Sequence, residues 1–407
     1  MPAKKCRICF NNLKKIIDLG KIALVGDFVL KKKRHKTYRI TLNHCKVCKH
    51  LQIAEYINPK KLFKKYLWET GVSSTNTILI DNLIHSLKKY KISSKSKVFE
   101  IACNDGTLLS LFKKKIKCKV LGIDPANLKL KNLKKNIIKD FFNYKKSIQV
   151  KKKYGQFDFI IARNVIAHLT NPNNVMQGVE KLLNKKGVFI IEVPHLLNII
   201  KKNQYDNIFH EHIGFHSLKS IIDLCKNFNL KVIDVDLIQS QGGSLRCYIV
   251  KNESKLKIEK KINIILKKET ESGLFNQSKL KNFSKKIKTH KKLFFKLIKN
   301  LHMSQKKISV YGASGKGMAL MQYCNLNDKF ISNIFDKSKI KINRYSPGFN
   351  IKVIDRKLLN VNSTDILVLL AWNLKNEIIK QENFFLKNGG KLVLPFPQPK
   401  IISYKNI

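Results

Sequence analysis

The densest group of titratable side chains in the sequence lies between Asp206 and Ser217, which reads DNIFHEHIGFHS. Four of them fall within seven residues, and they are His210, Glu211, His212 and His216. Histidine is the side chain best placed to move a proton near pH 7, so the segment predicts general acid–base chemistry. Two other interpretations stay open. His210 and His212 are two apart and would share one side of a strand, as in a metal site, or the segment is a surface loop with chance histidines.

Two cysteine pairs near the N-terminus have the spacing of a metal site. The pairs are Cys6-x-x-Cys9 and Cys45-x-x-Cys48. Two such turns form a tetrahedral zinc site with four thiolate ligands, and this site is predicted to be structural because no coordination position stays open. His44 and His50 flank the second pair and could replace a ligand. Four unpaired surface thiols, or a redox dithiol, are the alternatives.

The elements that would position such chemistry begin with a buried strand at Val98–Ala102. A tight turn at Asn104-Asp105-Gly106 closes it, a helix begins at Thr107, and a second strand at Val120–Ile123 ends at Asp124. This order predicts a parallel α/β sheet, in which ligands lie beyond the carboxyl ends of the strands. A carboxylate at the tip of the second strand suits a ribose diol, because it accepts hydrogen bonds from two hydroxyls at once.

The first loop of this sheet differs from a dinucleotide site. It contains no G-x-G-x-x-G, so no helix N-terminus is cleared for a pyrophosphate. The pattern E-x-x-x-N-D-G with the later G-x-D-P-A resembles the S-adenosylmethionine (SAM) loop of class I methyltransferases. The SAM contacts that this resemblance implies are Glu100, Ala102, Cys103, Asn104, Asp105, Gly106, Asp124 and Pro125.

Further polar residues follow the next predicted strands of the same sheet. Asp140 and Phe141 end a strand at Ile137–Phe141, where an adenine could stack and hydrogen-bond. A strand at Phe157–Ala162 delivers a polar cluster that includes Asn164 and His168. The remaining predicted elements are a helix at Thr77–Tyr90, a helix at Leu128–Lys135, a helix at Asn173–Leu183, a strand at Gly187–Val193, a helix at Leu218–Phe228 and an antiparallel hairpin of Leu230–Leu237 with Ser244–Val250.

A second α/β unit is predicted near the C-terminus. Lys307–Tyr311 is expected to form a strand that leads into the glycine-rich turn Gly312–Gly317, a natural phosphate cradle with Lys316 as a point charge. Asp336 follows the next strand, Ile331–Phe335. Further strands are expected at Asp365–Leu370 and Gly390–Leu394. A degenerate lobe with only a structural role is the alternative.

Composition sets the class of protein. A length of 407 residues suggests two to four domains, and the net charge is +54, from 81 basic and 27 acidic residues. The lysines are spread through almost every segment, which argues against specific nucleic-acid binding. There is no run of 18 apolar residues, no secretory signal and no disulfide framework among nine cysteines, so a cytoplasmic protein without a membrane partner is expected.

The order of these motifs resembles one enzyme family. N-D-G-T-L-L with G-I-D-P-A, then N-V-I-A-H, H-E-H and G-G-S-L-R follow a paired-cysteine module. This resembles the SAM-dependent C-methyltransferases that act on nucleotide-linked 4-keto deoxysugars. The resemblance implies methylation of a carbon next to the sugar ketone, with dTDP as the expected nucleotide. It also implies that His212 is the base, that Glu211 orients it, and that His168 and His210 are further catalytic candidates.

The resemblance also assigns substrate contacts, and these are Tyr66, Trp68, Phe209, Arg246, Ser314, Lys316 and Asp336. Three residues depart from the family pattern. Ala102 stands where Gly is usual, and Phe209 and Trp68 stand where Tyr is common. The two missing phenols affect contacts to the sugar or its enolate.

The expected fold class is α/β, a class I SAM methyltransferase sheet with an N-terminal zinc-binding module and a C-terminal Rossmann-like domain. The expected parts are residues 1–62 for the zinc module, 63–252 for the SAM domain, 253–302 for a helical connector and 303–407 for the nucleotide-binding domain. A monomer or weak homodimer is expected. The alternatives are a SAM-dependent enzyme with an oxygen or nitrogen acceptor, and a non-catalytic zinc or nucleic-acid-binding protein.

Overall fold

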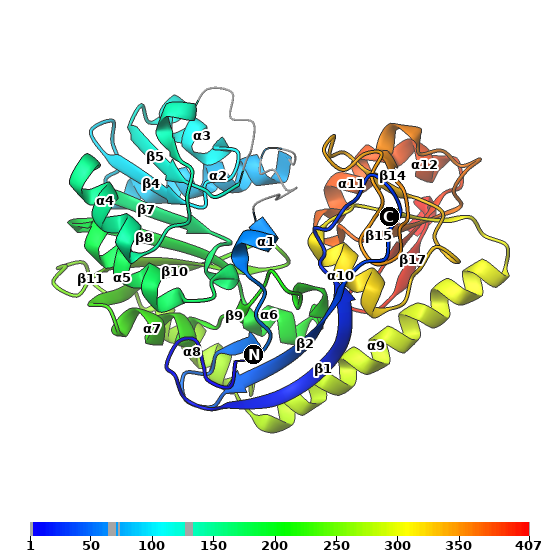
Figure 1. The fold of residues 1–407 in the computed structure, drawn as a ribbon, viewed down its shortest axis with the longest axis horizontal. Coiled ribbons are helices and arrows are strands. Elements are labelled where there is room, and N and C mark those ends of the chain that lie inside the picture. The colour runs from blue at the N-terminus through cyan, green and yellow to red at the C-terminus, as the bar shows by residue number, and fades with distance from the viewer. Residues whose placement is uncertain (1–2, 64–70, 72–73, 127–132, 407) are drawn as a thin grey trace.

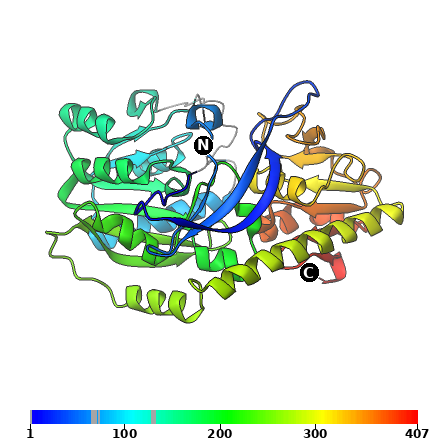
Figure 2. The same cartoon turned by 60° about the horizontal axis from the view of Figure 1, so that its bottom comes forward.

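The computed structural model describes residues 3–63, 71, 74–126 and 133–406 (Figure 1). Two α/β domains lie side by side, and a curved ribbon of β1 and β2 passes beneath them. The long helix α9 (Gln277–Met303) extends along the second domain (Figure 2). Tyr66 and Trp68, two of the predicted substrate contacts, lie outside the described residues.

The first α/β domain contains the predicted parallel sheet. In spatial order its strands are β10 (Leu230–Ile238), β11 (Ser244–Lys251), β8 (Leu183–Pro194), β7 (Phe157–Arg163), β4 (Lys97–Ile101), β5 (Lys119–Ile123) and β6 (Ile137–Ile138). The last five are parallel, and the hairpin of β10 and β11 joins antiparallel to β8. The strand order changes direction between β4 and β7, which places a switch point at the predicted SAM loop.

Two predicted elements of this domain differ in length. The strand expected at Ile137–Phe141 has only two residues, because Asp140 accepts a hydrogen bond from the amide of Phe141 and turns the chain out of the ladder. The helix expected at Leu128–Lys135 falls mostly on residues that are not described, and Lys134–Asn136 forms a single 3₁₀ turn.

Helices cover both faces of the sheet, and side-chain caps start three of them. The helices are α2 (Ser74–Ser86), α3 (Thr107–Lys115), α4 (Tyr144–Tyr154), α5 (Pro172–Leu182), α6 (Leu196–Lys201) and α7 (Leu218–Lys226). Asn143, Asn171 and Ser217 accept hydrogen bonds from the first turns of α4, α5 and α7. One apolar cluster packs α2 and α3 on one face, and another packs α4, α5 and α7 on the other.

The second α/β domain also contains a mainly parallel sheet, with six strands. Its strands in spatial order are β14 (Val353–Asp355), β13 (Ile334–Asp336), β12 (Ile308–Tyr311), β15 (Ile366–Leu369), β16 (Lys391–Leu394) and β17 (Lys400–Ile402). Its helices are α10 (Gly315–Tyr323), α11 (Lys375–Gln381) and α12 (Asn383–Lys387). All strands except β17 run parallel, and the switch point lies between β12 and β15. The glycine-rich turn follows β12, so it opens on this switch point.

The N-terminal module is a four-stranded antiparallel sheet that the chain completes much later. Its strands are β1 (Leu13–Ala23), β2 (Thr37–Cys45), β3 (Leu51–Ile53) and β9 (Gly214–Phe215), and a short helix α1 (Pro59–Phe63) follows. β9 comes directly after the H-E-H segment and pairs with β3. The far end of β1 meets the second domain, where the amide of Ala23 donates to Gln322 Oε1 at 2.7 Å. The module therefore contacts both α/β domains.

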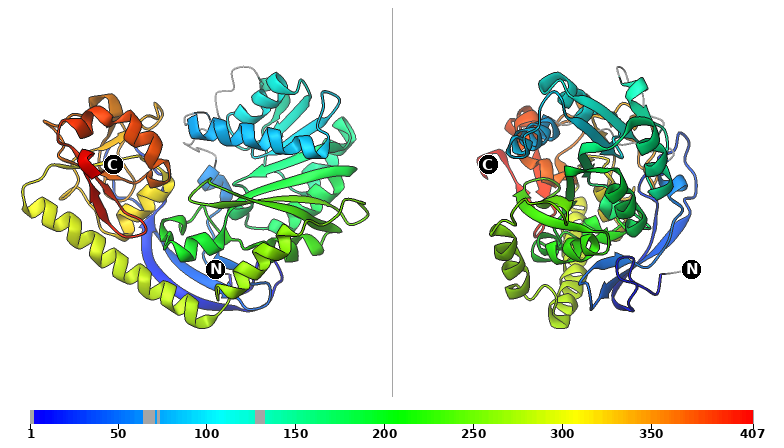
Figure 3. Two further views of the ribbon diagram at one scale, coloured as in Figure 1. Left: turned by 180° about the vertical axis from the view of Figure 1, so that it is seen from behind. Right: turned by 90° about the vertical axis from the view of Figure 1, so that its left-hand side faces the viewer.

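One apolar cluster joins these parts into a single body. It contains side chains from β1 and β2, from α6 and the Ile208–Ile213 segment, from α9 and from the second domain. Figure 3 shows the same ribbon from two further sides. Helix α8 (Lys261–Glu271) connects the first sheet to α9. In the described part of the chain, no helix is both long enough and apolar enough to cross a membrane.

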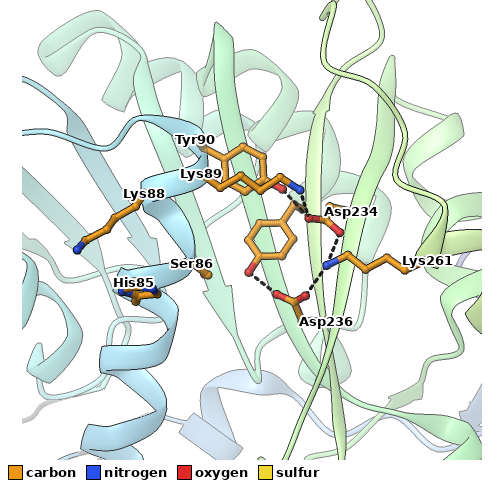
Figure 4. Close-up of a pocket in the computed structure, with 9 residues that line it drawn as sticks. His85, Ser86, Lys88, Lys89, Tyr90, Asp234, Asp236 and Lys261 are labelled. Atoms are coloured by element: carbon orange, nitrogen blue, oxygen red, sulfur yellow. Dashed lines mark hydrogen bonds and ion pairs between the residues drawn. The ribbon is translucent and has the colours of Figure 1, made fainter.

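An ion-pair network fastens α8 to the first sheet around a cavity of about 300 Å³ (Figure 4). Asp234 on β10 is its centre. The carboxylate accepts from Lys89 at 3.0 Å, from Lys261 at 2.7 Å and from the hydroxyl of Tyr90 at 3.0 Å. None of the predicted site residues lines this cavity. The network therefore stabilises the fold.

The substitution Asp234→Asn is expected to lower the free energy of unfolding by about 1.5–3 kcal/mol, the usual contribution of hydrogen bonds to charged groups. Burial raises the pKa of Asp234, but its bonds to Lys261 and Lys89 outweigh burial and hold the pKa below its usual value. A depressed carboxylate pKa stabilises the fold above the unfolded-state pKa of about 3.9, and this contribution is lost as the pH falls through the folded-state pKa.

Chemical denaturation at pH 7 and pH 3 measures this difference. The gap between wild type and Asp234→Asn should be smaller at pH 3. Glu271→Gln is the matched control, because its exposed pair with Lys267 should contribute less than about 1 kcal/mol. An equal effect of the two substitutions at pH 7 would contradict the assignment.

Candidate active site

The predicted SAM loop is a sharp left-handed turn at the end of β4. Ala102, Asn104 and Gly106 have φ values of 55°, 50° and 75°. Glycine takes such values without steric cost, whereas a residue with a Cβ is disfavoured by about 1–2 kcal/mol. Ala102 therefore costs backbone energy at this position. The turn is held by the network of Asp124.

Asp124 lies at the tip of β5 and braces this turn. Its Oδ2 accepts from the amide of Asn104 at 2.8 Å, and its Oδ1 accepts from the amide of Ala126 at 2.7 Å. Burial raises the pKa of this carboxyl above its usual value. Each carboxylate oxygen accepts two hydrogen bonds, so both oxygens keep a lone pair for a ribose hydroxyl.

The substitution Asp124→Ala is expected to weaken SAM binding about 10- to 150-fold, which corresponds to the loss of about 1.5–3 kcal/mol from a charged hydrogen bond. Calorimetric titration with SAM measures the effect, and thermal unfolding reports whether the turn still folds. Asp328→Ala is the control, since Asp328 is exposed in the second domain. SAM affinity at the wild-type level in Asp124→Ala would rule out the ribose contact.

Four acidic side chains, Glu100, Asp105, Asp124 and Glu192, lie near one another at the carboxyl edge of the first sheet. Glu100 is buried on β4, and its Oε2 has no hydrogen-bond partner. Burial raises the pKa of Glu100, Arg163 opposes the rise, and the carboxylates of Asp105, Asp124 and Glu192 add to it. A cationic ligand would satisfy the unpartnered oxygen and relieve this repulsion. SAM carries a sulfonium and an ammonium group, so the site fits it.

The other predicted SAM contacts surround this turn. Asp105 accepts from the amide of Gly71 at 2.9 Å and from the amide of Thr107 at 3.1 Å, just before α3. Cys103 is buried against Gly122, where a Cβ would lie 2.6 Å from its sulfur. Asp140 pairs with Lys146 at 2.7 Å beside Phe141. Adenine recognition by Asp140 and Phe141 stays a prediction, as does the contact of Pro125.

His212 is the histidine that this sheet edge and the second domain both approach. Its Nδ1 lies 3.0 Å from the carbonyl oxygen of Asn207, so Nδ1 carries the hydrogen and Nε2 is the free acceptor. The centroid of its ring lies 4.2 Å from that of the Phe209 ring and 4.8 Å from that of the His168 ring. Burial, with the charges of His168 and Lys316, holds the pKa of His212 well below its usual value. The imidazole is therefore neutral at pH 7.

His168 lies beside His212 on the 3₁₀ turn after β7. Its Nδ1 lies 2.7 Å from the carbonyl oxygen of Glu211, and burial lowers the pKa of His168 to about 4. Asn164, four residues earlier, has a positive φ of 53° and a buried Oδ1 without a partner. His168 thus lies beside His212, and the roles of His168 and Asn164 near the oxyanion or the sulfonium stay predictions.

The predicted role of Glu211 in orienting His212 is corrected by the structure. The carbonyl of Asn207 orients the imidazole, and neighbouring positions in an irregular loop do not place two side chains together. Glu211 is buried near Gly26, and burial raises its pKa to about 7 while the charge of Lys341 opposes the rise. The carboxyl is thus poised to titrate near neutral pH.

The metal interpretation of His210 and His212 is also corrected. The segment is not a strand, and the two rings contact different partners. The Nε2 of His210 lies 3.1 Å from the carbonyl oxygen of Tyr38 in β2, and its ring meets the Tyr38 ring edge-on. His210 therefore faces the N-terminal module. Among the described residues, the one group suited to a metal is the cysteine cluster.

Arg246 lies on β11 of the first sheet, and its predicted substrate contact stays a prediction. Its Nε donates to Glu192 at 2.7 Å, and Arg163 donates to the same carboxylate at 2.8 Å. The three residues are cross-strand neighbours on β11, β8 and β7. Burial raises the pKa of Glu192, but the two guanidinium groups outweigh burial and hold it below its usual value.

The four predicted zinc ligands converge at one end of the N-terminal module. Their sulfur atoms all lie within 4.8 Å of one another, with Cys6 and Cys48 at 3.4 Å and Cys9 and Cys45 also at 3.4 Å. Four thiol groups at such separations fit a tetrahedral zinc ion. The hydrogen bond between Cys6 and Cys48 lowers the pKa of Cys6 to about 5 and raises the pKa of Cys48, so the sulfur geometry carries the assignment.

The glycine-rich turn of the second domain is braced like the SAM loop. Asp336 accepts from the amide of Ala313 at 2.6 Å and from the amide of Ser338 at 2.7 Å. Ser314 caps α10 through the amide of Gly317 at 3.1 Å. Lys316, predicted to face a phosphate, is buried, and its Nζ donates to the carbonyl of Gln241 at 3.0 Å. Its phosphate role stays a prediction.

Two residues near His212 were missed from the sequence. Asn207 forms a 3₁₀ turn with Asp206 immediately before the H-E-H segment, and this Asp-Asn pair is a turn signal that could have pointed to it. Lys341 donates to the carbonyl of Ala313 at 2.9 Å, and its charge opposes the rise in the pKa of Glu211. No local pattern marks Lys341, because the fold alone brings it to this loop.

Family models match the chain in three consecutive parts. They describe a zinc binding domain over residues 6–63, a methyltransferase domain over residues 76–235 and a C-methyltransferase C-terminal domain over residues 239–397. The chain therefore carries the three domains of a SAM-dependent C-methyltransferase. A curated relative, the C-methyltransferase NovU of Streptomyces niveus, is 26% identical over 410 residues, 99% of this chain and 97% of NovU.

Solved structures also resemble this C-methyltransferase. Magnesium protoporphyrin IX methyltransferase from Synechocystis, with bound S-adenosylhomocysteine, is 12% identical with a TM-score of 0.34 and covers 45% of this chain and 90% of its own. A SAM-dependent methyltransferase from Anabaena variabilis is 14% identical with a TM-score of 0.33 and covers 42% and 83%. The fold assignment rests on the sheet topology and the family models.

Proposed function

We propose that this C-methyltransferase transfers a methyl group to a nucleotide-linked 4-keto deoxysugar, with dTDP as the nucleotide, at a carbon next to the ketone. The observation that carries the proposal is the state of His212. Its Nδ1 is fixed on the carbonyl of Asn207, so Nε2 is a neutral acceptor in the segment next to the SAM sheet. An acceptor of this kind suits removal of a proton from carbon.

The reaction needs a base because a C–H bond does not attack an electrophile unaided. In the proposed step, Nε2 of His212 takes the proton next to the ketone, and the electron pair of that bond forms an enolate. The carbon acid has a pKa far above that of imidazole, so groups that stabilise the developing oxyanion must supply much of the rate. The side-chain amide of Asn164, which follows β7 at the carboxyl edge of the sheet, is proposed as one such donor.

SAM supplies the electrophilic methyl group for this carbanion. The chain's part is to hold the two reactants in line, which is a large source of rate in reactions of this kind. The brace between Asp124 and Asn104 fixes the loop on one side. The contacts of Phe209 and Asn207 fix His212 on the other. The four cysteines take no part in the reaction. They stabilise the N-terminal module, in which β3 pairs with β9.

The nucleotide part is proposed to bind the second domain. Its glycine-rich turn lies at the switch point between β12 and β15, and a turn of this kind presents backbone amides to a phosphate. Ser314 and Asp336 shape the turn. Glu211 is proposed to contact the sugar, because its carboxyl is buried in the same loop as His212.

The test is an assay with [methyl-¹³C]SAM and dTDP-linked 4-keto-6-deoxyglucose, read by NMR of the product. The proposal predicts a ¹³C methyl group bonded to a carbon next to the ketone, with long-range correlations to the carbonyl carbon. A methyl group with the chemical shift of an oxygen- or nitrogen-bound methyl would instead identify another acceptor class. No transfer to any 4-keto sugar nucleotide would contradict the substrate class.

A further inference from the structure

Lys316 crosses from the second α/β domain into the first. It is the second residue of α10 and is 7% exposed. Its Nζ donates to the carbonyl of Gln241 at 3.0 Å, in the turn between β10 and β11. An ammonium group has three hydrogens, so two remain for other acceptors after this bond. A buried cation of this kind is costly unless it is paired and hydrogen-bonded.

The segment that carries His212 lies against the same end of α10. Asp206 is fully buried and accepts from the indole of Trp372 at 2.7 Å, which ties the segment to the second domain. A Cβ on Gly315 would lie 3.4 Å from the ring of Phe209, so the first turn of α10 packs on that ring. Phe209 in turn packs on His212 at 4.2 Å. A continuous set of contacts therefore links α10 to the base.

The charge of Lys316 interacts with the carboxylate of Asp206 and with the imidazole of His212. Asp206 is the acidic residue that supports the ammonium, and the ammonium is one of two charges that lower the pKa of His212. His212 thus has a cation as a neighbour although a cation weakens it as a base. That arrangement is unfavourable for a resting histidine, and it is useful if negative charge develops beside the ring during the reaction.

Building on the proposed function, we propose that Lys316 is a catalytic group whose ammonium stabilises the enolate oxygen formed when His212 removes the proton. The C–H bond breaks, the proton goes to Nε2 of His212, and its electron pair forms the carbon–carbon double bond of the enolate. The negative charge moves to the former carbonyl oxygen, next to the ammonium. Lys316 keeps its proton. The second domain therefore takes part in the chemistry as well as in binding.

The test compares wild type with Lys316→Met, as full chains, for deuterium exchange into dTDP-linked 4-keto-6-deoxyglucose in D₂O without SAM. The exchange rate should fall about 10²- to 10³-fold, the usual effect of removing one donor to an oxyanion. The KM for the sugar nucleotide and the affinity for SAM should change less than about threefold. Lys329→Met is the matched control, because Lys329 is exposed in the same domain.

A second measurement separates catalysis from a structural role. Burial lowers the pKa of Lys316 to about 8, so exchange by the wild type should decline as the pH rises through about 8. Lys316→Arg keeps a charge that does not titrate there and should lose this decline. The titratable groups around Lys316 are Asp206 and His212 on the facing segment, Lys202, which donates to Gly242 in the β10–β11 turn, and Asp336 and Lys341 at the glycine-rich turn.

Three outcomes would overturn the inference. Exchange at the wild-type rate in Lys316→Met with a raised KM would make Lys316 a phosphate ligand instead. If Lys316→Met does not fold, an alkaline decline that persists in Lys316→Arg would also reject the role. No exchange by the wild type would contradict the proposed function itself, and the inference with it, whereas wild-type exchange with an unaffected Lys316→Met contradicts the inference alone.

Discussion

His212→Ala is expected to lower the turnover number by about 10²- to 10⁴-fold and to abolish deuterium exchange next to the ketone, with SAM binding intact. The physical reason is the loss of the acceptor at Nε2, whose state is set by the bond between Nδ1 and Asn207. Steady-state turnover, NMR of the substrate in D₂O and calorimetry with SAM measure the three quantities. The control is His85→Ala, since His85 is exposed on α2.

The neighbouring histidines make this prediction specific. His210 faces Tyr38, so His210→Ala should act on stability more than on exchange. His168 contacts the ring of His212, so His168→Ala should slow exchange without abolishing it. If His212→Ala exchanges and methylates normally while His210→Ala or His168→Ala does not, the base is one of those two residues.

Cys45→Ser is expected to lose both zinc and solubility. The four sulfur atoms lie within 4.8 Å of one another, and metal binding and folding of such a small site form one event. Metal analysis should find about one zinc per wild-type chain and much less in the variant, with a larger insoluble fraction. Cys118→Ser is the control, because Cys118 is a single buried thiol outside the module. Unchanged zinc content in Cys45→Ser would reject the assignment.

Loss of zinc is also expected to change the position of the segment that carries His212. β9 begins two residues after His212 and pairs with β3, which begins three residues after Cys48. A module that unfolds would release β9 and with it the position of His212. Removal of zinc by a chelator from the wild type should therefore reduce exchange, even though zinc takes no part in the proton transfer.

The parts of the site that lie on regular elements could be predicted from the sequence. The strand at Val98–Ala102, its turn and Asp124 follow from an apolar run, a turn signal and an acid at a strand tip. The structure has β4 and β5 at these positions and Asp124 bonded to the turn. The zinc cluster was predictable because paired cysteines place ligands locally before any tertiary contact forms.

The parts that depend on tertiary contacts could not be predicted. Glu211 is next to His212 in sequence, yet the irregular loop directs the two side chains to different partners. Arg246 follows a Gly-Gly turn, but its strand places it against Glu192. Lys316 follows a phosphate-type pattern, and only the docking of α10 on the H-E-H segment brings its charge to His212.

The proposed mechanism depends most directly on enolate formation by the protein alone. The decisive measurement is proton NMR of dTDP-linked 4-keto-6-deoxyglucose in D₂O, with wild-type protein and without SAM, against a sample without protein. Proton abstraction by His212 predicts that the signal of the carbon-bound hydrogen next to the ketone disappears faster with the protein than without it. An unchanged signal, from a protein preparation that methylates the same sugar nucleotide when SAM is added, would contradict an enolate formed by His212.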